Sequence, residues 1–217
     1  MAISLKTKKE NAKKIIDILK NTYPDAKCSL DFSKPFEMVV AVMLSAQCTD
    51  ERVNLTTPAL FKRCPEISDY VNIDIKELEN LIHPCGFYRN KAKNIKTCAN
   101  QVLNDFNGIV PNNMEDLLTL AGVGRKSANV ILLEVYGIAN GIAVDTHAKR
   151  ISNKMGLSNE SDPSKIEADL IKIFDKDDLK FINHLFVWHG RNTCTARNPK
   201  CSNCTVKEFC KYNSSLK

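Results

Sequence analysis

The sequence lacks several features, and each absence removes a class of protein. No stretch approaches the roughly 20 consecutive apolar residues of a membrane-spanning helix. The N-terminal sequence MAISLKTKKE is polar and has no apolar middle of the kind that signal peptides carry. There is no convincing strand pattern, internal repeat or low-complexity segment. With 217 residues, of which 43% are hydrophobic and 26% charged, the chain can bury one or two small cores. We therefore expect a globular protein of the cytoplasm with no membrane partner.

A phosphate-binding P-loop is also absent, although residues 120–129, LAGVGRKSAN, contain a similar Lys-Ser pair. The P-loop pattern requires glycine at its first and sixth positions, where this window has Leu120 and Arg125. Three interpretations of Lys126, which follows the Gly-Val-Gly turn, stay open at this point. It belongs to a helix cap, it grips a DNA backbone, or it is a nucleophile held at the start of a helix.

Apolar residues recur with helical spacing almost throughout the chain, which predicts an all-α fold. The segment 35–47, PFEMVVAVMLSAQ, is apolar on all sides and is expected to be a central buried helix. Asp74 and Asn113 are predicted helix caps, and Gly137 is a predicted helix end. The predicted helices cover residues 10–23, 35–47, 75–82, 90–106, 114–120, 126–136, 146–155, 164–174 and 178–188.

Two of these helices flank AGVGR at 121–125, an arrangement typical of a helix-hairpin-helix motif. Glycine has no Cβ, so the backbone of such a turn can come close to a phosphate while amides of the following helix point outward. That geometry grips DNA without reading its sequence. The alternative is an ordinary tight connection between core helices.

The distribution of basic residues bears on this choice. Lys and Arg outnumber Asp and Glu by 31 to 25. Residues 194–217 hold five basic side chains against the single acid Glu208, and residues 86–98 hold no acid at all. Such runs are more often ordinary solvated faces than nucleic-acid sites, but beside a glycine hairpin they favour DNA. The basic residues of 86–98 are Arg89, Lys91, Lys93 and Lys96.

The nine cysteines fall into two groups. In a reducing compartment, clustered thiols are metal ligands or reactive groups rather than disulfides. Four cysteines within residues 194–210, separated by six, two and five residues, predict a metal site. Only one pair has the spacing of a zinc knuckle, so zinc stays open while the wider loops favour a [4Fe-4S] cluster. The other five, Cys28, Cys48, Cys64, Cys85 and Cys98, are expected to be small buried hydrophobic residues.

Together these motifs resemble the endonuclease III family, the DNA glycosylases and abasic-site lyases of base excision repair. The resemblance covers nearly the entire chain in the family's order, and the cysteine spacing is that of the family's iron–sulfur site. The residues that carry it are LAGVGRKSANV at 120–130, IAVDTH at 142–147, HGRNTC at 189–194, MLSAQCTDERVN at 43–54 and CGFYRNKAKNI at 85–95.

The resemblance implies two all-α lobes with DNA across the cleft between them. Residues 27–137 would form a six-helix barrel that carries the helix-hairpin-helix at about 113–136. Residues 1–26 and 138–217 would form the lobe with the [4Fe-4S] cluster. The chain departs from the family at Ala121, where proline is common, and we expect this change to loosen the turn slightly. The implied cluster ligands are Cys194, Cys201, Cys204 and Cys210.

Lys126 resembles the family's catalytic lysine and Asp145 its catalytic aspartate. An amine that attacks the anomeric carbon expels the base and forms a Schiff base, from which β-elimination follows. A nearby carboxylate can stabilise oxocarbenium charge and help to move protons. The alternatives are an exposed helix lysine and an N-cap for a helix that begins at Thr146. We take His147 as structural.

A flipped-out base leaves a gap that the protein must fill. Gln47 resembles the residue that the family inserts toward the orphaned partner base, and Phe87 lies where a bulky wedge is expected. The alternatives are a helix-end glutamine and a buried aromatic. The remaining expected DNA contacts are Gly122, Val123, Gly124 and Arg125 of the hairpin, and Arg197 and Lys200 of the loop TARNPK.

The resemblance implies a monomer that removes oxidised pyrimidines from double-stranded DNA and cleaves 3′ to abasic sites. The nearest rival is the adenine glycosylase of the same superfamily, which uses no lysine nucleophile. Lys126 argues against it, and we expect no room for that enzyme's C-terminal recognition domain in the seven residues after Cys210. A zinc-stapled DNA-binding module and a redox sensor built on the cluster are alternatives of another class.

Overall fold

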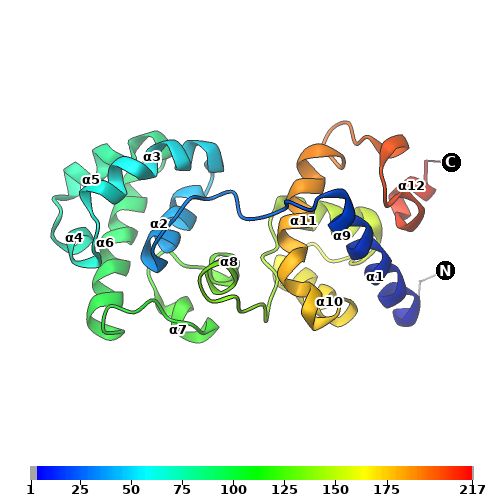
Figure 1. Ribbon diagram of the computed structural model, residues 1–217, viewed down its shortest axis with the longest axis horizontal. Coiled ribbons are helices and arrows are strands. Elements are labelled where there is room, and N and C mark those ends of the chain that lie inside the picture. Colours follow the sequence, from blue (N-terminus) through cyan, green and yellow to red (C-terminus); the bar gives the residue numbers. More distant parts are fainter. Residues whose placement is uncertain (1–3, 217) are drawn as a thin grey trace. The chain divides into compact units, whose positions relative to one another are not determined.

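The computed structural model describes residues 4–216, and every regular element in that range is a helix (Figure 1). The all-α prediction is therefore confirmed for these residues. No helix within 4–216 combines the length and apolar character that crossing a membrane requires. The chain divides into two compact units. The split unit consists of the N-terminal segment up to Cys28 and the segment from Ile138 onward, and the continuous unit is Ser29–Gly137.

A central apolar helix organises the continuous unit. The helices of this unit are α2 (Pro35–Ser45), α3 (Asp50–Arg63), α4 (Ile67–Asn72), α5 (Ile75–Ile82), the short 3₁₀ helix η1 (His83–Cys85), α6 (Tyr88–Asp105), α7 (Met114–Thr119) and α8 (Arg125–Tyr136). Helix α2 packs against α3, α6 and α8. The unbroken apolar run Met38–Leu44 buries all sides of α2, as the sequence predicts.

Capping residues set the helix boundaries of this unit where the sequence predicts them. The Asp74 carboxylate accepts two backbone N–H bonds of the first turn of α5, at 2.8 and 3.2 Å. The Asn113 side chain accepts a backbone N–H bond at the start of α7, at 2.9 Å. Gly137 ends α8 with a φ of +67°, a left-handed conformation that favours glycine.

Helix α3 is not predicted by the sequence pattern. Pro58 lies inside this helix, and the β-branched Thr56 and Thr57 have low helix propensity. The helix forms because its ends are well set and its weak residues are buried. The Thr49 hydroxyl accepts a first-turn N–H bond at 3.2 Å, acidic residues begin the helix and basic residues end it. Both threonines are buried, so packing outweighs local propensity.

The split unit closes around a core to which its N-terminal helix contributes. Its helices are α1 (Leu5–Thr22), α9 (Thr146–Met155), α10 (Pro163–Ile173), η2 (Lys176–Asp178), α11 (Leu179–Asn192), η3 (Cys201–Asn203), η4 (Lys207–Phe209) and α12 (Lys211–Ser214). Ile15, Ile16 and Leu19 of α1 are fully buried in this core. Burial of three such side chains is worth roughly 5–9 kcal/mol, comparable with the net stability of a whole domain.

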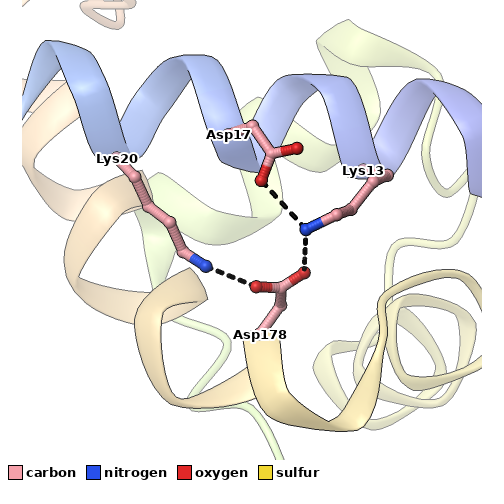
Figure 2. Close-up of polar contacts among 4 residues, drawn as sticks. All are labelled: Lys13, Asp17, Lys20 and Asp178. Carbon is pink, nitrogen blue, oxygen red and sulfur yellow. Dashed lines mark hydrogen bonds and ion pairs between the residues drawn. The ribbon is translucent and has the colours of Figure 1, made fainter.

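A charge cluster secures α1 to the start of α11 (Figure 2). The Asp178 carboxylate, 5% exposed, accepts bonds from the Lys20 ammonium and from Lys13, the latter at 3.4 Å. Lys13 also pairs with the exposed Asp17 at 3.0 Å. Burial alone would raise the pKa of Asp178, but the two lysines outweigh it and hold the pKa below its ordinary value. Removal of one partner would leave a buried charge uncompensated.

Of the five cysteines outside the C-terminal cluster, all predicted to be buried, three are buried and two are not. Cys64, Cys85 and Cys98 are buried, and burial raises the pKa of Cys64 to about 11 and that of Cys98 to about 12. Such thiols are inert packing groups. Cys28 and Cys48 are only half-buried, so the prediction of a buried side chain is wrong for these two.

Candidate functional site

The hairpin turn of the continuous unit joins α7 to α8 and depends on Gly122. Its φ is +79°, and a Cβ there would lie 3.0 Å from Cβ of Asn94 on α6. A Cβ at Gly124, the N-cap of α8, would meet nothing within 4 Å. The fold therefore requires the first glycine, whereas the second keeps open space above the helix start, where an anion can approach.

Val123, between these glycines, is committed to the turn itself. Its side chain is 6% exposed, and its backbone N–H donates to the carbonyl of Leu120 at 3.1 Å. Of the four hairpin residues predicted to contact DNA, Val123 therefore offers neither its side chain nor an unengaged amide. Burial makes Val123 an anchor of the turn, while its contact with DNA stays a prediction.

Gln101 of α6 clamps the turn. Its Oε1 accepts the Ala121 N–H at 2.8 Å, and its Nε2 donates to the carbonyl of Thr119 at 3.0 Å. A proline at position 121 has no N–H and could not make the first bond. Ala121 thus supplies a contact in place of the rigidity of a proline ring. The role of Gln101 is not predictable from the sequence, because no local pattern connects it to a turn 20 residues away.

Lys126 is the second residue of α8, and its side chain is exposed, like that of Arg125 before it. The first amides of a helix have no intrahelical partner, and the helix dipole concentrates partial positive charge there. The amine of Lys126 is therefore accessible and lies beside a backbone that suits phosphates. Exposure agrees with both interpretations of Lys126, the nucleophile and the ordinary surface lysine.

Asp145 belongs to the split unit, where it is the half-buried N-cap of α9. Its Oδ1 accepts the backbone N–H of Ala148 at 2.7 Å, so Asp145 does cap the helix that begins at Thr146. That bond engages one carboxylate oxygen and orients the side chain, which leaves the second oxygen for other partners. Lys126 lies in the continuous unit.

Arg150 of α9 joins the helix that Asp145 caps to the start of the cysteine tail. It donates to the carbonyl of Cys194 at 2.9 and 3.0 Å and to that of Gly190 at 3.1 Å. Its Nη2 lies 3.1 Å from Nδ1 of His147, whose pKa is lowered by burial. A neutral imidazole packed on an arginine fits the structural role expected for His147. The role of Arg150 is not predictable from the sequence, since nothing in the local sequence marks it.

Gln47 and Phe87 share a strained backbone. Their φ values, +54° and +47°, lie in the left-handed region, which costs a non-glycine residue roughly 1–2 kcal/mol. Within residues 4–216, the only other non-glycine residue there is Asn107, of a type that tolerates it. Strain of this kind clusters at functional sites. Both side chains are exposed, Phe87 by 64%, so the buried-aromatic alternative is wrong.

These two side chains border one cavity of about 250 Å³ in the continuous unit. The hairpin reaches the same cavity through Gly122. Two strained turns and the glycine turn therefore meet at one surface. The other residues that line the cavity are Met43, Ala46, Asn90, Lys91 and Asn94.

The basic run 86–98 presents less charge to solvent than its composition suggests. Lys91 and Lys96 each donate to two backbone carbonyls of the continuous unit, whereas the other two basic residues are exposed. Lys91 precedes Ile95 by four residues and Val102 by eleven, and both are buried. Helical spacing therefore places Lys91 on the apolar stripe, a signal that a count of charges overlooks.

The four C-terminal cysteines line a single cavity of the split unit, together with His189. The Cys204 sulfur lies 3.7 Å from Nε2 of His189, and that of Cys210 lies 3.4 Å from the carbonyl of Lys154. Burial raises the pKa of the Cys194 and Cys204 thiols, so thiolates there require a cation. No three metal-binding side chains of residues 4–216 converge as a single-ion site requires. Four thiols around one volume fit an iron–sulfur cluster.

Arg197 and Lys200 are exposed on the loop between the first two cysteines. The loop is closed by its own hydrogen bonds. The Lys200 N–H donates to the carbonyl of Thr193 at 2.9 Å, and the Thr195 hydroxyl donates to that of Asn198 at 2.7 Å. A closed loop presents its two cations at fixed positions, as a contact with successive phosphates requires.

Two family models match the chain. Residues 40–176 match the HhH-GPD superfamily base excision DNA repair protein, and residues 194–210 match the iron–sulfur binding domain of endonuclease III. Endonuclease III of Synechocystis sp. is 48% identical over 204 residues, which cover 94% of this chain and 93% of that protein. Endonuclease III of Bacillus subtilis is 39% identical over 197 residues, or 90% of each chain.

Solved structures agree with the sequence relatives. A non-covalent endonuclease III–DNA complex superposes with a TM-score of 0.90 at 36% identity, covering 96% of this chain and 97% of the other. A trapped endonuclease III–DNA covalent intermediate has the same TM-score and identity, with coverage of 96% and 98%. The chain therefore belongs to the endonuclease III family of the HhH-GPD superfamily, base excision DNA glycosylases with lyase activity that carry an iron–sulfur cluster of the [4Fe-4S] type.

Proposed function

We propose that this enzyme removes oxidised pyrimidines from duplex DNA and then cleaves the strand 3′ to the resulting abasic site. One observation carries the proposal. An accessible lysine amine, that of Lys126, stands at the first turn of α8 directly after a glycine hairpin. The trapped covalent DNA intermediate of an endonuclease III that is 36% identical supports a covalent route of this kind.

Lys126 is the nucleophile in this proposal. Its deprotonated amine attacks C1′ of the damaged nucleotide, and the bond from C1′ to the base breaks as the base leaves with the bonding electrons and takes up a proton. The sugar ring opens to a Schiff base, which makes the C2′ proton acidic. Loss of that proton and departure of the 3′ phosphate complete β-elimination. Hydrolysis of the imine then frees the lysine.

Asp145 acts on charge and protons rather than as a nucleophile. Its carboxylate stabilises the oxocarbenium character of C1′ while the base departs, and it assists transfer of the proton. The capping bond at 2.7 Å supports this role, because it orients one oxygen and leaves the other available. Asparagine is an equally good N-cap, so exchange of Asp145 for asparagine tests the charge without loss of the helix start.

DNA is held by its phosphates and distorted at the lesion. Gly122, Gly124 and Arg125 supply the hairpin's backbone contacts, with Val123 as the buried anchor beneath them. Extrusion of a base costs a few kcal/mol. The exposed Gln47 and Phe87 side chains oppose that cost by occupying the gap, while Arg197 and Lys200 hold phosphates.

The C-terminal tail holds the iron–sulfur cluster in this proposal. Its four cysteines are the cluster ligands, and the bound cluster supplies a covalent crosslink of the loop, with no chemistry in base removal. We infer a monomer, since every proposed functional residue comes from one chain. We also infer work in the cytoplasm, because the matched relatives are bacterial and bacterial DNA is cytoplasmic.

Borohydride trapping tests the assignment of Lys126. Reduction of the imine should give a stable adduct between the wild-type enzyme and abasic DNA. Lys126→Ala should abolish both adduct and strand cleavage while DNA affinity stays within about threefold, since the grip comes from backbone and distant cations. Lys93→Ala, at another exposed lysine of the continuous unit, should change neither the adduct yield nor strand cleavage. A full adduct yield from Lys126→Ala, mapped to another amine, would refute the nucleophile.

Asp145→Asn separates the two chemical steps in the same assay. Base removal should slow by a factor on the order of 10² or more. Adduct formation at a pre-formed abasic site should persist, because no base has to leave. Equal losses on both substrates would contradict the role given to Asp145.

A further inference from the structure

Lys91 is a buried lysine whose amine bridges the C-terminal ends of two helices, α2 and η1. It is 7% exposed and donates to the carbonyl of Leu44 at 2.8 Å and to that of Cys85 at 2.9 Å. Burial lowers its pKa, as expected for an ammonium kept from water. A buried cation is costly to keep from water, and the two acceptors of Lys91 are neutral carbonyls rather than carboxylates. Stability alone therefore gives little reason for a lysine at this position.

The two carbonyls belong to segments that end just before the strained turns. Leu44 lies in the last turn of α2, where carbonyls lack intrahelical partners, and Gln47 follows three residues later. Cys85 is the last residue of η1, and Phe87 follows two residues later. One amine thus satisfies the acceptors at the base of both turns.

The strained turns need support of this kind. A left-handed backbone at a residue other than glycine persists only where its surroundings over-determine it. Gln47, Phe87 and Lys91 line the same cavity, so the amine and both turns belong to one surface. Without the bridge, each turn could relax toward ordinary φ values and carry its side chain away from that surface.

We propose that Lys91 is a positioning residue that fixes the Gln47 and Phe87 turns relative to one another, so that both side chains can occupy the gap left by an extruded base. This inference rests on the proposed function for what the turns do, and on the contacts of Lys91 for how they are held. Lys91 itself touches neither the reacting sugar nor Lys126 in this role.

Lys96 provides a matched control on the same helix. Its amine also donates to two backbone carbonyls, those of Val71 and Ile73, at 2.7 and 2.5 Å. These acceptors lie in the last turn of α4 and at its C-cap, away from the strained turns. Lys91→Met and Lys96→Met therefore remove the same bonds from the same helix but release different segments.

Hydrogen exchange of the free protein tests the bridge independently of catalysis. Lys91→Met should speed exchange of the amides at 46–48 and 86–88 on the order of tenfold, whereas Lys96→Met should speed exchange around 71–75 instead. The same pattern from both variants, or no change at the two turns, would overturn the role of Lys91. If Lys91→Met does not fold, Lys91→Gln keeps a shorter neutral donor. If neither variant folds, Lys91 is required for folding, and its proposed positioning role is refuted.

Single-turnover rates test the consequence for the reaction. Excision of an oxidised pyrimidine from duplex DNA should fall on the order of tenfold to a hundredfold in Lys91→Met. Cleavage of a pre-formed abasic site should fall by about threefold at most, since no base is extruded. Lys96→Met should keep the wild-type ratio of the two rates, and an unchanged ratio in Lys91→Met would refute positioning. A wild type without excision would refute the proposed function, while hydrogen exchange would still decide whether Lys91 holds the turns.

Discussion

The continuous unit and the tail of the split unit differ in how much apolar surface holds them. In the continuous unit, the hairpin and both strained turns rest on helices with buried apolar stripes. The Gln101 amide holds the hairpin, and the Lys91 ammonium bonds the segments before both strained turns. Between α11 and Leu216, every helix has only three or four residues, and Val206 is a fully buried apolar anchor. The difference indicates that the hairpin is stable through its own packing, whereas the tail depends on its four thiols.

Loss of a cluster ligand should have the largest effect, and that effect should be confined to the tail. We expect Cys204→Ser to lose iron and to speed amide exchange after Thr193 by roughly a hundredfold or more, because residues 201–214 bury too little apolar surface to stay ordered alone. Helices of the continuous unit should keep their protection. Exchange mass spectrometry and iron analysis measure both effects.

Cys28→Ser is the matched control, since this half-buried cysteine does not line the tail cavity. It should retain iron and protection throughout the chain. Equal loss of protection in both units on Cys204→Ser would show that the hairpin also depends on the cluster, contrary to the comparison.

How far the fold was predictable also differs between elements. Helices 75–82 and 146–155 begin and end at the predicted residues, because strong caps and apolar stripes are local signals. Helix α3 was missed, since it holds Pro58 and owes its stability to burial of two threonines, which only tertiary structure reveals.

At the site, the residue types and their order were predictable, but their long-range contacts were not. Gln101 reaches a turn 20 residues away, and Arg150 reaches a carbonyl 44 residues away. The left-handed backbone of Gln47 and Phe87 was not predictable either. Residue types other than glycine, asparagine and aspartate rarely adopt positive φ, so neither residue indicates it. Contacts and strain follow from packing, which periodicity does not encode.

The charge cluster of Figure 2 should make a smaller contribution, to the stability of the split unit. Asp178→Asn should lower the free energy of unfolding of the split unit by about 1–2 kcal/mol, since the lysines lose a buried anionic partner. Asp17→Asn should change it very little, because Asp17 is half exposed and pairs with Lys13 alone. Thermal unfolding of the two variants measures the difference, and equal effects would contradict the importance of burial.

The same cluster predicts acid sensitivity. The folded pKa of Asp178 lies below its ordinary value, so the unfolded chain binds the proton more readily than the folded one. Its contribution is complete above about pH 4 and is lost as the pH falls further, through the folded pKa. Wild type should therefore lose more stability than Asp178→Asn below about pH 4, as pH-dependent denaturation would measure. Parallel curves for the two proteins would exclude this origin.

The smallest effect on stability should come from the two cations of the tail loop. Arg197→Ala combined with Lys200→Ala removes exposed side chains that support no packing, so melting temperature and iron content should stay unchanged. DNA affinity should fall for all duplexes alike, and the slope of log affinity against log salt should flatten by about 0.9 for each lost phosphate contact. Lys6→Ala combined with Lys9→Ala removes the same net charge from the exposed face of α1 and should leave that slope nearly unchanged. If the two double variants flatten the slope equally, net charge alone explains the loss, and the tail loop has no specific place on the DNA.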